Sequence, residues 1–195
     1  MPNLTTIPEQ NFEKARDYIA AILVDEFTNN PIGGETPNVY TERIAPVDKV
    51  NLPAVNIVFA QANNSLLDSS SNKFEYIFNI DCYANGKVAS GNRAGTNASI
   101  DLHKLVGVVK QILLNPVYKT LSFTNGEMGK RMINSIQVAE PFQKTDANST
   151  TMARIQYQIE LTDQVQKPDP EIAAQSTTKV NIEETDSGYL WTISQ

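Results

Sequence analysis

The stretch KFEYIFNIDCYA, residues 73–84, decides the fold class of this 195-residue chain. Apolar residues occupy every second position from Phe74 to Cys82, and polar residues such as Glu75 and Asp81 alternate with them. A period of two is typical of a β-strand that has one buried face and one wet face. The stretch therefore predicts a strand of a largely antiparallel sheet that is covered on one side only.

The same alternation recurs in four other segments. It is cleanest at residues 150–162, where Ala153, Ile155 and Tyr157 alternate with polar residues, and weaker at 38–45, 53–61 and 131–139. In the last of these, Met132, Ile136 and Val138 are predicted to share one face. The Asn- and Ser-rich segment 62–72 is either a long hairpin or a loop that a neighbour orders.

Two segments carry the helical period instead. Residues 9–28 place Phe12, Ala15, Ile19, Ile22 and Leu23 on one stripe that Phe27 extends, and residues 98–115 do the same with Leu102, Leu105, Val106, Val109 and Leu113. Pro31 and Pro116 follow the two segments and end them. Asn97 or Ser99 is expected to cap the second helix. The order α-β-β-β-α-β-β predicts an α+β domain, residues 1–165, with both helices packed on one face of the sheet.

The character of the chain changes after residue 165. A proline-containing linker leads to two short strand-like segments, 179–183 and 189–194, so residues 166–195 are predicted to be a C-terminal extension. The apolar and aromatic residues Val180, Ile182, Tyr189 and Trp191 are candidates for a subunit contact, made by adding a strand to a neighbour's sheet. The alternative is a terminal hairpin that folds back on the chain's own sheet.

Charge and cysteine content narrow the class of protein. The net charge is -6 and the basic residues are scattered, which argues against a nucleic-acid binder, because such proteins concentrate Lys and Arg against phosphates. The N-terminus lacks a signal peptide, and no apolar run approaches the roughly 20 residues that cross a bilayer. We therefore expect a protein of a reducing cytosol with no membrane partner.

The residues needed for common site chemistry are scarce. Cys82 and His103 are the only residues of their types, so neither a Cys–His or Ser–His nucleophilic site nor a zinc site is expected from them. Glu75 and Asp81 share a strand face but lie roughly 20 Å apart along the strand, and are interpreted as solvated charges. No phosphate-binding glycine loop is present. The sequence thus predicts no catalytic residue, no cofactor and no metal, and a function carried by surfaces.

Several runs together resemble a known family, the tail terminator (tail completion) proteins of long-tailed bacteriophages and related minor tail or neck proteins. The resemblance covers about residues 10–165, and LPAVNIV is its most suggestive run. The runs are ARDYIAAIL (15–23), NVYTERIAP (38–46), LPAVNIV (52–58), FEYIFNIDCYA (74–84) and LHKLVGVVKQIL (102–113).

The resemblance implies a structural virion protein that forms a homo-oligomeric ring of six copies on the head-proximal end of the tail tube. The implied partners are the tail tube protein, the neck or head-completion protein and, in contractile tails, the sheath protein. DNA would pass through the ring without specific binding, which suits the acidic balance, and assembly would occur in the host bacterial cytoplasm. Within the same class, another tail component of similar fold (tube, sheath-binding or baseplate protein) is the alternative. Outside it, the alternative is a non-viral protein-binding module.

Overall fold

The computed structural model describes residues 9–44, 47, 51–67, 71–87, 94–124, 127–139, 148–164, 179–185 and 188–194. Its first unit, Met1–Asp163, is an α+β domain, as predicted. The elements follow in the order α1 (Asn11–Asn29), β1 (Asn38–Thr41), β2 (Ala54–Leu67), β3 (Ser71–Lys87), α2 (Ala94–Leu114), β4 (Met128–Ala139) and β5 (Asn148–Gln164). The five strands form one sheet in the order β1-β2-β3-β5-β4.

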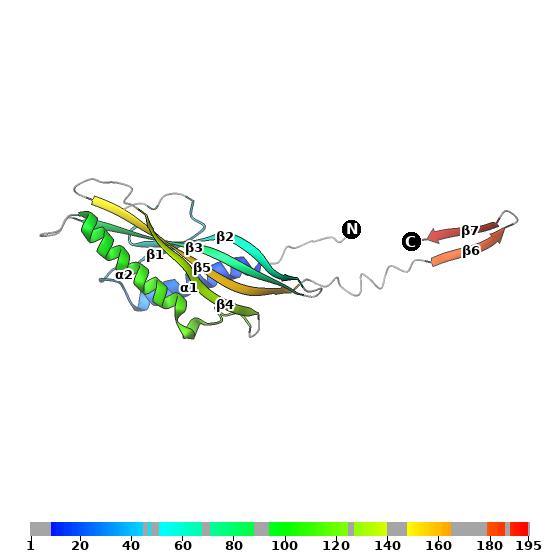
Figure 1. Cartoon of the computed structure of the whole chain (residues 1–195), viewed down its shortest axis with the longest axis horizontal. Coiled ribbons are helices and arrows are strands. Elements are labelled where there is room, and N and C mark those ends of the chain that lie inside the picture. The colour runs from blue at the N-terminus through cyan, green and yellow to red at the C-terminus, as the bar shows by residue number, and fades with distance from the viewer. Residues whose placement is uncertain are drawn as a thin grey trace. The chain divides into compact units, whose positions relative to one another are not determined.

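The sheet is mostly antiparallel. β2 pairs with β3 and β4 pairs with β5 in antiparallel register, whereas the short edge strand β1 runs parallel to β2. Both helices pack on one face, because residues of α1 and α2 join a single core with one parity of the central strands (Figure 1). The sheet residues that belong to this core are Val55, Ile57, Tyr76, Phe78, Ile80, Cys82, Ala84, Ala153, Ile155, Tyr157, Ile159 and Leu161.

The first helix buries its predicted stripe. Ala15, Ile19, Leu23 and Phe27 are all within 1% of complete burial. At the N-terminal end the carboxylate of Glu13 accepts a hydrogen bond from the backbone N–H of Gln10 at 2.8 Å, which satisfies one donor at the start of the helix. Beyond the C-terminal end Gly33 and Gly34 take positive φ angles of 62° and 86°, so the chain reverses there without a side-chain clash.

The strands β2 and β3 are longer than the sequence predicted. Segment 62–72 is the long hairpin of the two alternatives, since β2 extends to Leu67 and pairing continues to Leu67↔Asn72. β3 also continues through Asn85 and Gly86, a pair of turn-forming residue types, to Lys87. Turn-forming residue types were overridden by pairing with neighbouring strands. The predicted strand at 38–45 also stops early, at Thr41.

The second helix begins at Ala94, four residues before the predicted start. Asn97 and Ser99 therefore lie inside the helix, and the prediction that either caps it is wrong. Leu102, Leu105, Val109 and Leu113 of the predicted stripe are at most 3% exposed, and Val106 is half-buried against the core. Pro116 begins a 3-10 turn, Pro116–Tyr118, in which the side chain of Asn115 accepts a hydrogen bond from Val117 N.

The edge strand β4 contains two register shifts, between Met128 and Arg131 and between Ile133 and Ser135. Cross-strand partners point to the same face of a sheet. Met132 pairs with Gln158 on the face away from the helices, and Ile136 pairs with the buried Ile155 on the helix face. The prediction that Met132, Ile136 and Val138 share one face is therefore wrong, since a β-bulge reverses the alternation between them.

The second unit, Gln164–Gln195, contains a hairpin of β6 (Lys179–Thr185) and β7 (Gly188–Ser194). The two strands pair antiparallel in a two-stranded sheet of their own. The two predicted strand segments are thus paired with each other.

A candidate assembly surface

The two residues best suited to nucleophilic chemistry lie apart and in unlike surroundings. Cys82 is completely buried under the helices, and burial, assisted by the charge of Asp81, raises the pKa of its thiol far above the usual range. A buried neutral thiol is a poor nucleophile. His103 lies on the exposed side of α2. The structure therefore does not bring Cys82 and His103 together.

The sequence predicted that the face of the sheet away from the helices is exposed to solvent. The surroundings of Asp81 correct this prediction. The residue is only 4% exposed although it points away from the helices. Both of its carboxylate oxygens accept hydrogen bonds from Arg154 on β5, at 2.7 and 2.8 Å. The hydrogen bond to Asp81 and, to a smaller extent, the negative charge of that carboxylate raise the pKa of the Arg154 guanidinium. This bidentate pair fixes β3 against β5.

Asn56 shows that the outer face is also covered near β1. It is 4% exposed, its side-chain oxygen accepts from Arg43 N at 3.2 Å, and its amide donates to Arg43 O at 3.0 Å. The segment that follows β1 is thereby held over β2. Asp81 and Asn56 are paired Cα partners across β2 and β3, so the two buried polar groups are neighbours.

No metal-binding group is present among the described residues: nowhere in those ranges do three or more His, Cys, Asp or Glu side chains converge. Among the same residues, no helix is long and apolar enough to cross a membrane.

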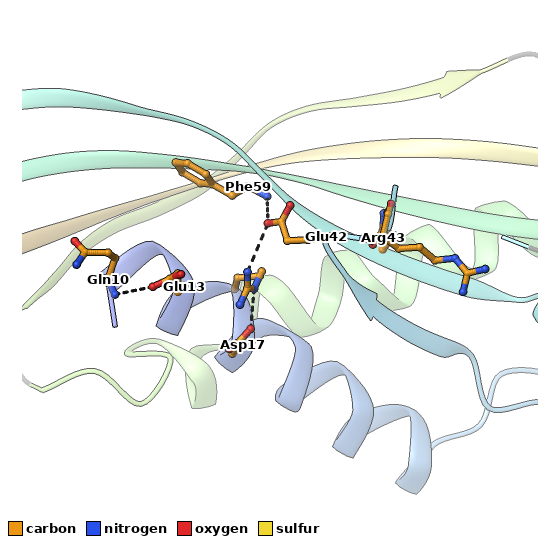
Figure 2. A network of polar contacts seen from close by, with 8 residues as sticks. Gln10, Glu13, Asp17, Glu42, Arg43 and Phe59 are labelled. Atoms are coloured by element: carbon orange, nitrogen blue, oxygen red, sulfur yellow. Dashed lines mark hydrogen bonds and ion pairs between the residues drawn. The ribbon is translucent and has the colours of Figure 1, made fainter. Parts of the chain in front are cut away.

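The β1 edge of the sheet is closed by Glu42. This residue takes a left-handed φ of 51°, which turns the chain away from β2. Its carboxylate then accepts a hydrogen bond from Phe59 N at 2.8 Å, the donor that a longer β1 would have satisfied. Figure 2 shows the contact, with Asp17 of α1 on the other side of the same network. Arg16 links the two, lying 2.7 Å from the Asp17 carboxylate and 3.9 Å from that of Glu42.

The opposite edge, β4, has its register shifts before Ser135, and after them the described part of the strand has no turn comparable to that at Glu42. From Met132 to Ala139 the strand carries no charged residue, although charges are a common device for preventing edge pairing. Three large apolar side chains are exposed along it: Met132 at 49%, Ile136 at 40% and Val138 at 57%. In the described residues β4 has one neighbour, β5. The regular part, from Ser135 to Ala139, is thus an uncharged strand with an open side among the described residues.

Arg131 holds this edge in place. Its guanidinium donates to the carbonyl oxygens of Leu113 (3.0 Å), Tyr118 (2.9 Å) and Asn115 (2.7 Å), all at the C-terminal end of α2 or in the turn that follows. A cation suits that end of a helix, where carbonyl groups lack partners. The start of β4 is therefore rigidly attached to the helix layer.

The predicted contact residues Val180, Ile182, Tyr189 and Trp191 all lie within the β6–β7 hairpin. Ile182 pairs with Trp191, and Val180 pairs with Ile193, while Tyr189 pairs with Glu184. The apolar positions of the two strands therefore coincide in register. The sequence reasoning missed Met132, Ile136 and Val138 as contact candidates, although the eight uncharged residues around them were a usable signal.

The comparisons with known proteins add little to this geometry. No family model and no curated protein matches the sequence. One solved structure aligns with 83% of this chain and 100% of its own, at 11% sequence identity and a TM-score of 0.42. A likeness at that level carries no statement about function.

Proposed function

We propose that this chain is a non-enzymatic structural protein that assembles with other copies into a ring on the head-proximal end of a phage tail tube. The ring ends tube polymerisation and forms the surface on which the neck docks. The observation that carries the proposal is the β4 edge, an uncharged strand with three exposed apolar side chains. Such an edge promotes aggregation of a monomer, whereas in a closed assembly it can pair with a neighbouring subunit.

The choice of assembly comes from the resemblance to tail terminator proteins. The element order that accompanies that resemblance, α-β-β-β-α-β-β, is the order of the folded domain. The net charge of -6 fits a ring through which DNA slides, since an acidic wall repels phosphates.

The first test is the mass of the purified protein in solution. A ring of six copies has six times the 21.6 kDa of one chain and is visible as an annulus by electron microscopy. The second test adds the protein to tubes that are polymerising from the tube protein of the same phage. Caps at one tube end and arrested growth support the proposal.

Two results would overturn it. A protein that stays monomeric at high concentration and binds no tube end is not a terminator. Binding along the sides of tubes, without arrest of growth, would instead indicate a sheath-binding or tube component.

A further inference from the structure

Among the described residues, two uncharged strand edges are long and regular enough to accept a further strand, and they lie in different units. One is β4 from Met132 to Ala139, and the other is the whole of β7, Gly188–Ser194. The remaining edges are guarded. β1 is four residues long and is followed by the Glu42 turn, and β6 carries Lys179, Glu183 and Glu184.

The free part of β2, beyond Phe59, is also uncharged but is a poor acceptor. Register shifts lie at both of its ends, between Phe59 and Gln61 and between Asn64 and Leu66. Its exposed residues Ala60–Asn64 are small or carry amides. Bulges of this kind disrupt edge pairing.

The β6–β7 hairpin needs a partner. A two-stranded hairpin alone is only marginally stable in water, and its apolar residues recur at the paired positions Val180↔Ile193 and Ile182↔Trp191. The strand β4 offers what such a hairpin lacks: a regular backbone edge with Ile136 and Val138 exposed on one face. Charge also favours the match, because the charged residues of β4 are Lys130 and Arg131, whereas the hairpin has one base and two acids.

We propose that β7 of one copy adds to the β4 edge of a second copy, so that the five-stranded sheet of the acceptor continues into the donor's hairpin. This inference rests on the proposed function in requiring that several copies assemble. The sheet order at the junction is β3-β5-β4 of the acceptor followed by β7-β6 of the donor. The charged strand β6 then forms the new outer edge and prevents further addition.

The number of residues between β5 and β6 permits this exchange. The 14 residues at 165–178 can span at most about 50 Å when fully extended, which is the scale of a neighbouring domain. The same length would also permit docking on the chain's own β4, and the test separates the two outcomes.

The first measurement compares Val138→Lys with Val117→Lys in the full-length chain. Val138 is 57% exposed on β4, and Val117 is 78% exposed in the 3-10 turn Pro116–Tyr118, which is not part of a strand. Burying a lysine at the junction is unfavourable, so Val138→Lys is expected to weaken assembly at least about tenfold by sedimentation, a change of 1.4 kcal/mol or more. Val117→Lys is expected to assemble like the wild type. Equal assembly of both variants would overturn the contact.

The second measurement identifies donor and acceptor chains. Val138→Cys and Thr192→Cys are placed in separate chains with tags of different size, co-expressed, and treated with a short thiol-specific cross-linker. The native Cys82 gives no background, because it is fully buried. The expected product is a cross-linked pair of one chain of each kind, absent when either variant is alone.

Three outcomes separate this contact from the proposed function. Rings without the cross-linked pair overturn the β7–β4 contact and leave the ring proposal standing. A cross-link that forms only when both cysteines are in one chain shows docking on the chain's own sheet and overturns the exchange. A protein that neither assembles nor cross-links overturns both.

Discussion

Arg131 donates a hydrogen bond to the carbonyl oxygen of Leu113, at 3.0 Å, and so joins the edge strand β4 to the end of α2. Leu113 O also lies 3.3 Å from the hydroxyl of Tyr157 on β5, which donates to it. One carbonyl group at the end of a helix thus receives donors from two adjacent strands. The helix layer thus positions β4, while Met132, Ile136 and Val138 on that strand stay exposed.

Replacement of Arg131 by Lys is expected to lower the free energy of unfolding by about 1–2 kcal/mol, because a single ammonium group cannot reach three carbonyl oxygens in a fork. Urea denaturation measures the change. Arg16→Lys is the matched control, since the Arg16 guanidinium contacts carboxylates whose side chains are 51% and 39% exposed, and pairs with exposed partners contribute little. Equal losses for the two variants would contradict a special role for Arg131.

Loss of Arg154 should leave a buried carboxylate without its partner. Arg154→Met is expected to lower stability by about 2 kcal/mol, and Asp81→Asn by about 1 kcal/mol. Because Arg154 is 44% exposed on its side chain, these values are at the low end for a buried pair. The double variant should be more stable than the sum of the two single losses predicts, by about 1 kcal/mol. Strict additivity in thermal or urea unfolding would show that the pair is not coupled.

Two glycines offer opposite outcomes for the same substitution. A Cβ atom on Gly129 would lie 1.9 Å from Oε1 of Glu160, so Gly129→Ala must displace that carboxylate from Lys73, which it contacts at 2.7 Å. The expected loss is about 0.5–1 kcal/mol. In α2, Gly107 has open space around its Cβ position, so Gly107→Ala should stabilise the fold by about 0.5–1 kcal/mol. A stabilised Gly129→Ala variant would contradict the account.

The Glu160 carboxylate is expected to stabilise the fold at neutral pH and to lose this effect in acid. The hydrogen bond from Lys73, assisted by the backbone N–H of Lys130, lowers the pKa of this carboxyl below its ordinary value of 4.5. A lowered folded-state pKa means that the stabilisation is present above about pH 4.5 and is lost as the pH falls through the folded-state value. Glu160→Gln should remove this part of the pH dependence while leaving the slope above pH 5 unchanged. If Glu160→Gln loses as much stability at low pH as the wild type, other carboxyl groups account for that loss.

The alternation of apolar residues was enough to predict the class of fold, the element order and most of the core. Strands β3 and β5 lie in the middle of the sheet, where one face is fully buried, so their period is unbroken and strong. The helices could be predicted equally well, because each of them buries a single stripe of apolar residues. The ends of the strands were harder to predict, because pairing with a neighbouring strand extended β2 and β3 through residues with low strand propensity, such as Asn85 and Gly86.

The candidate surface was harder to predict, for reasons that lie in tertiary structure. Which strand forms the edge depends on the strand order, which local alternation does not encode. The bulge between Ile133 and Ser135 reverses the faces of β4 without a glycine or proline to mark it. Asp81 reads as a surface charge until Arg154, distant in the sequence by 73 positions, is placed beside it.

The two edges of the five-stranded sheet are unlike: Glu42 closes one, and the other is open. Subunits that join through such one-sided contacts form a ring when the rotation between neighbours closes and an open filament when it does not, and they cannot pair face to face through the same patch. A closed ring of this kind has two chemically different faces. That inequality is what a junction piece requires, because one face must recognise the repeating subunits of a tube while the other must recognise something else.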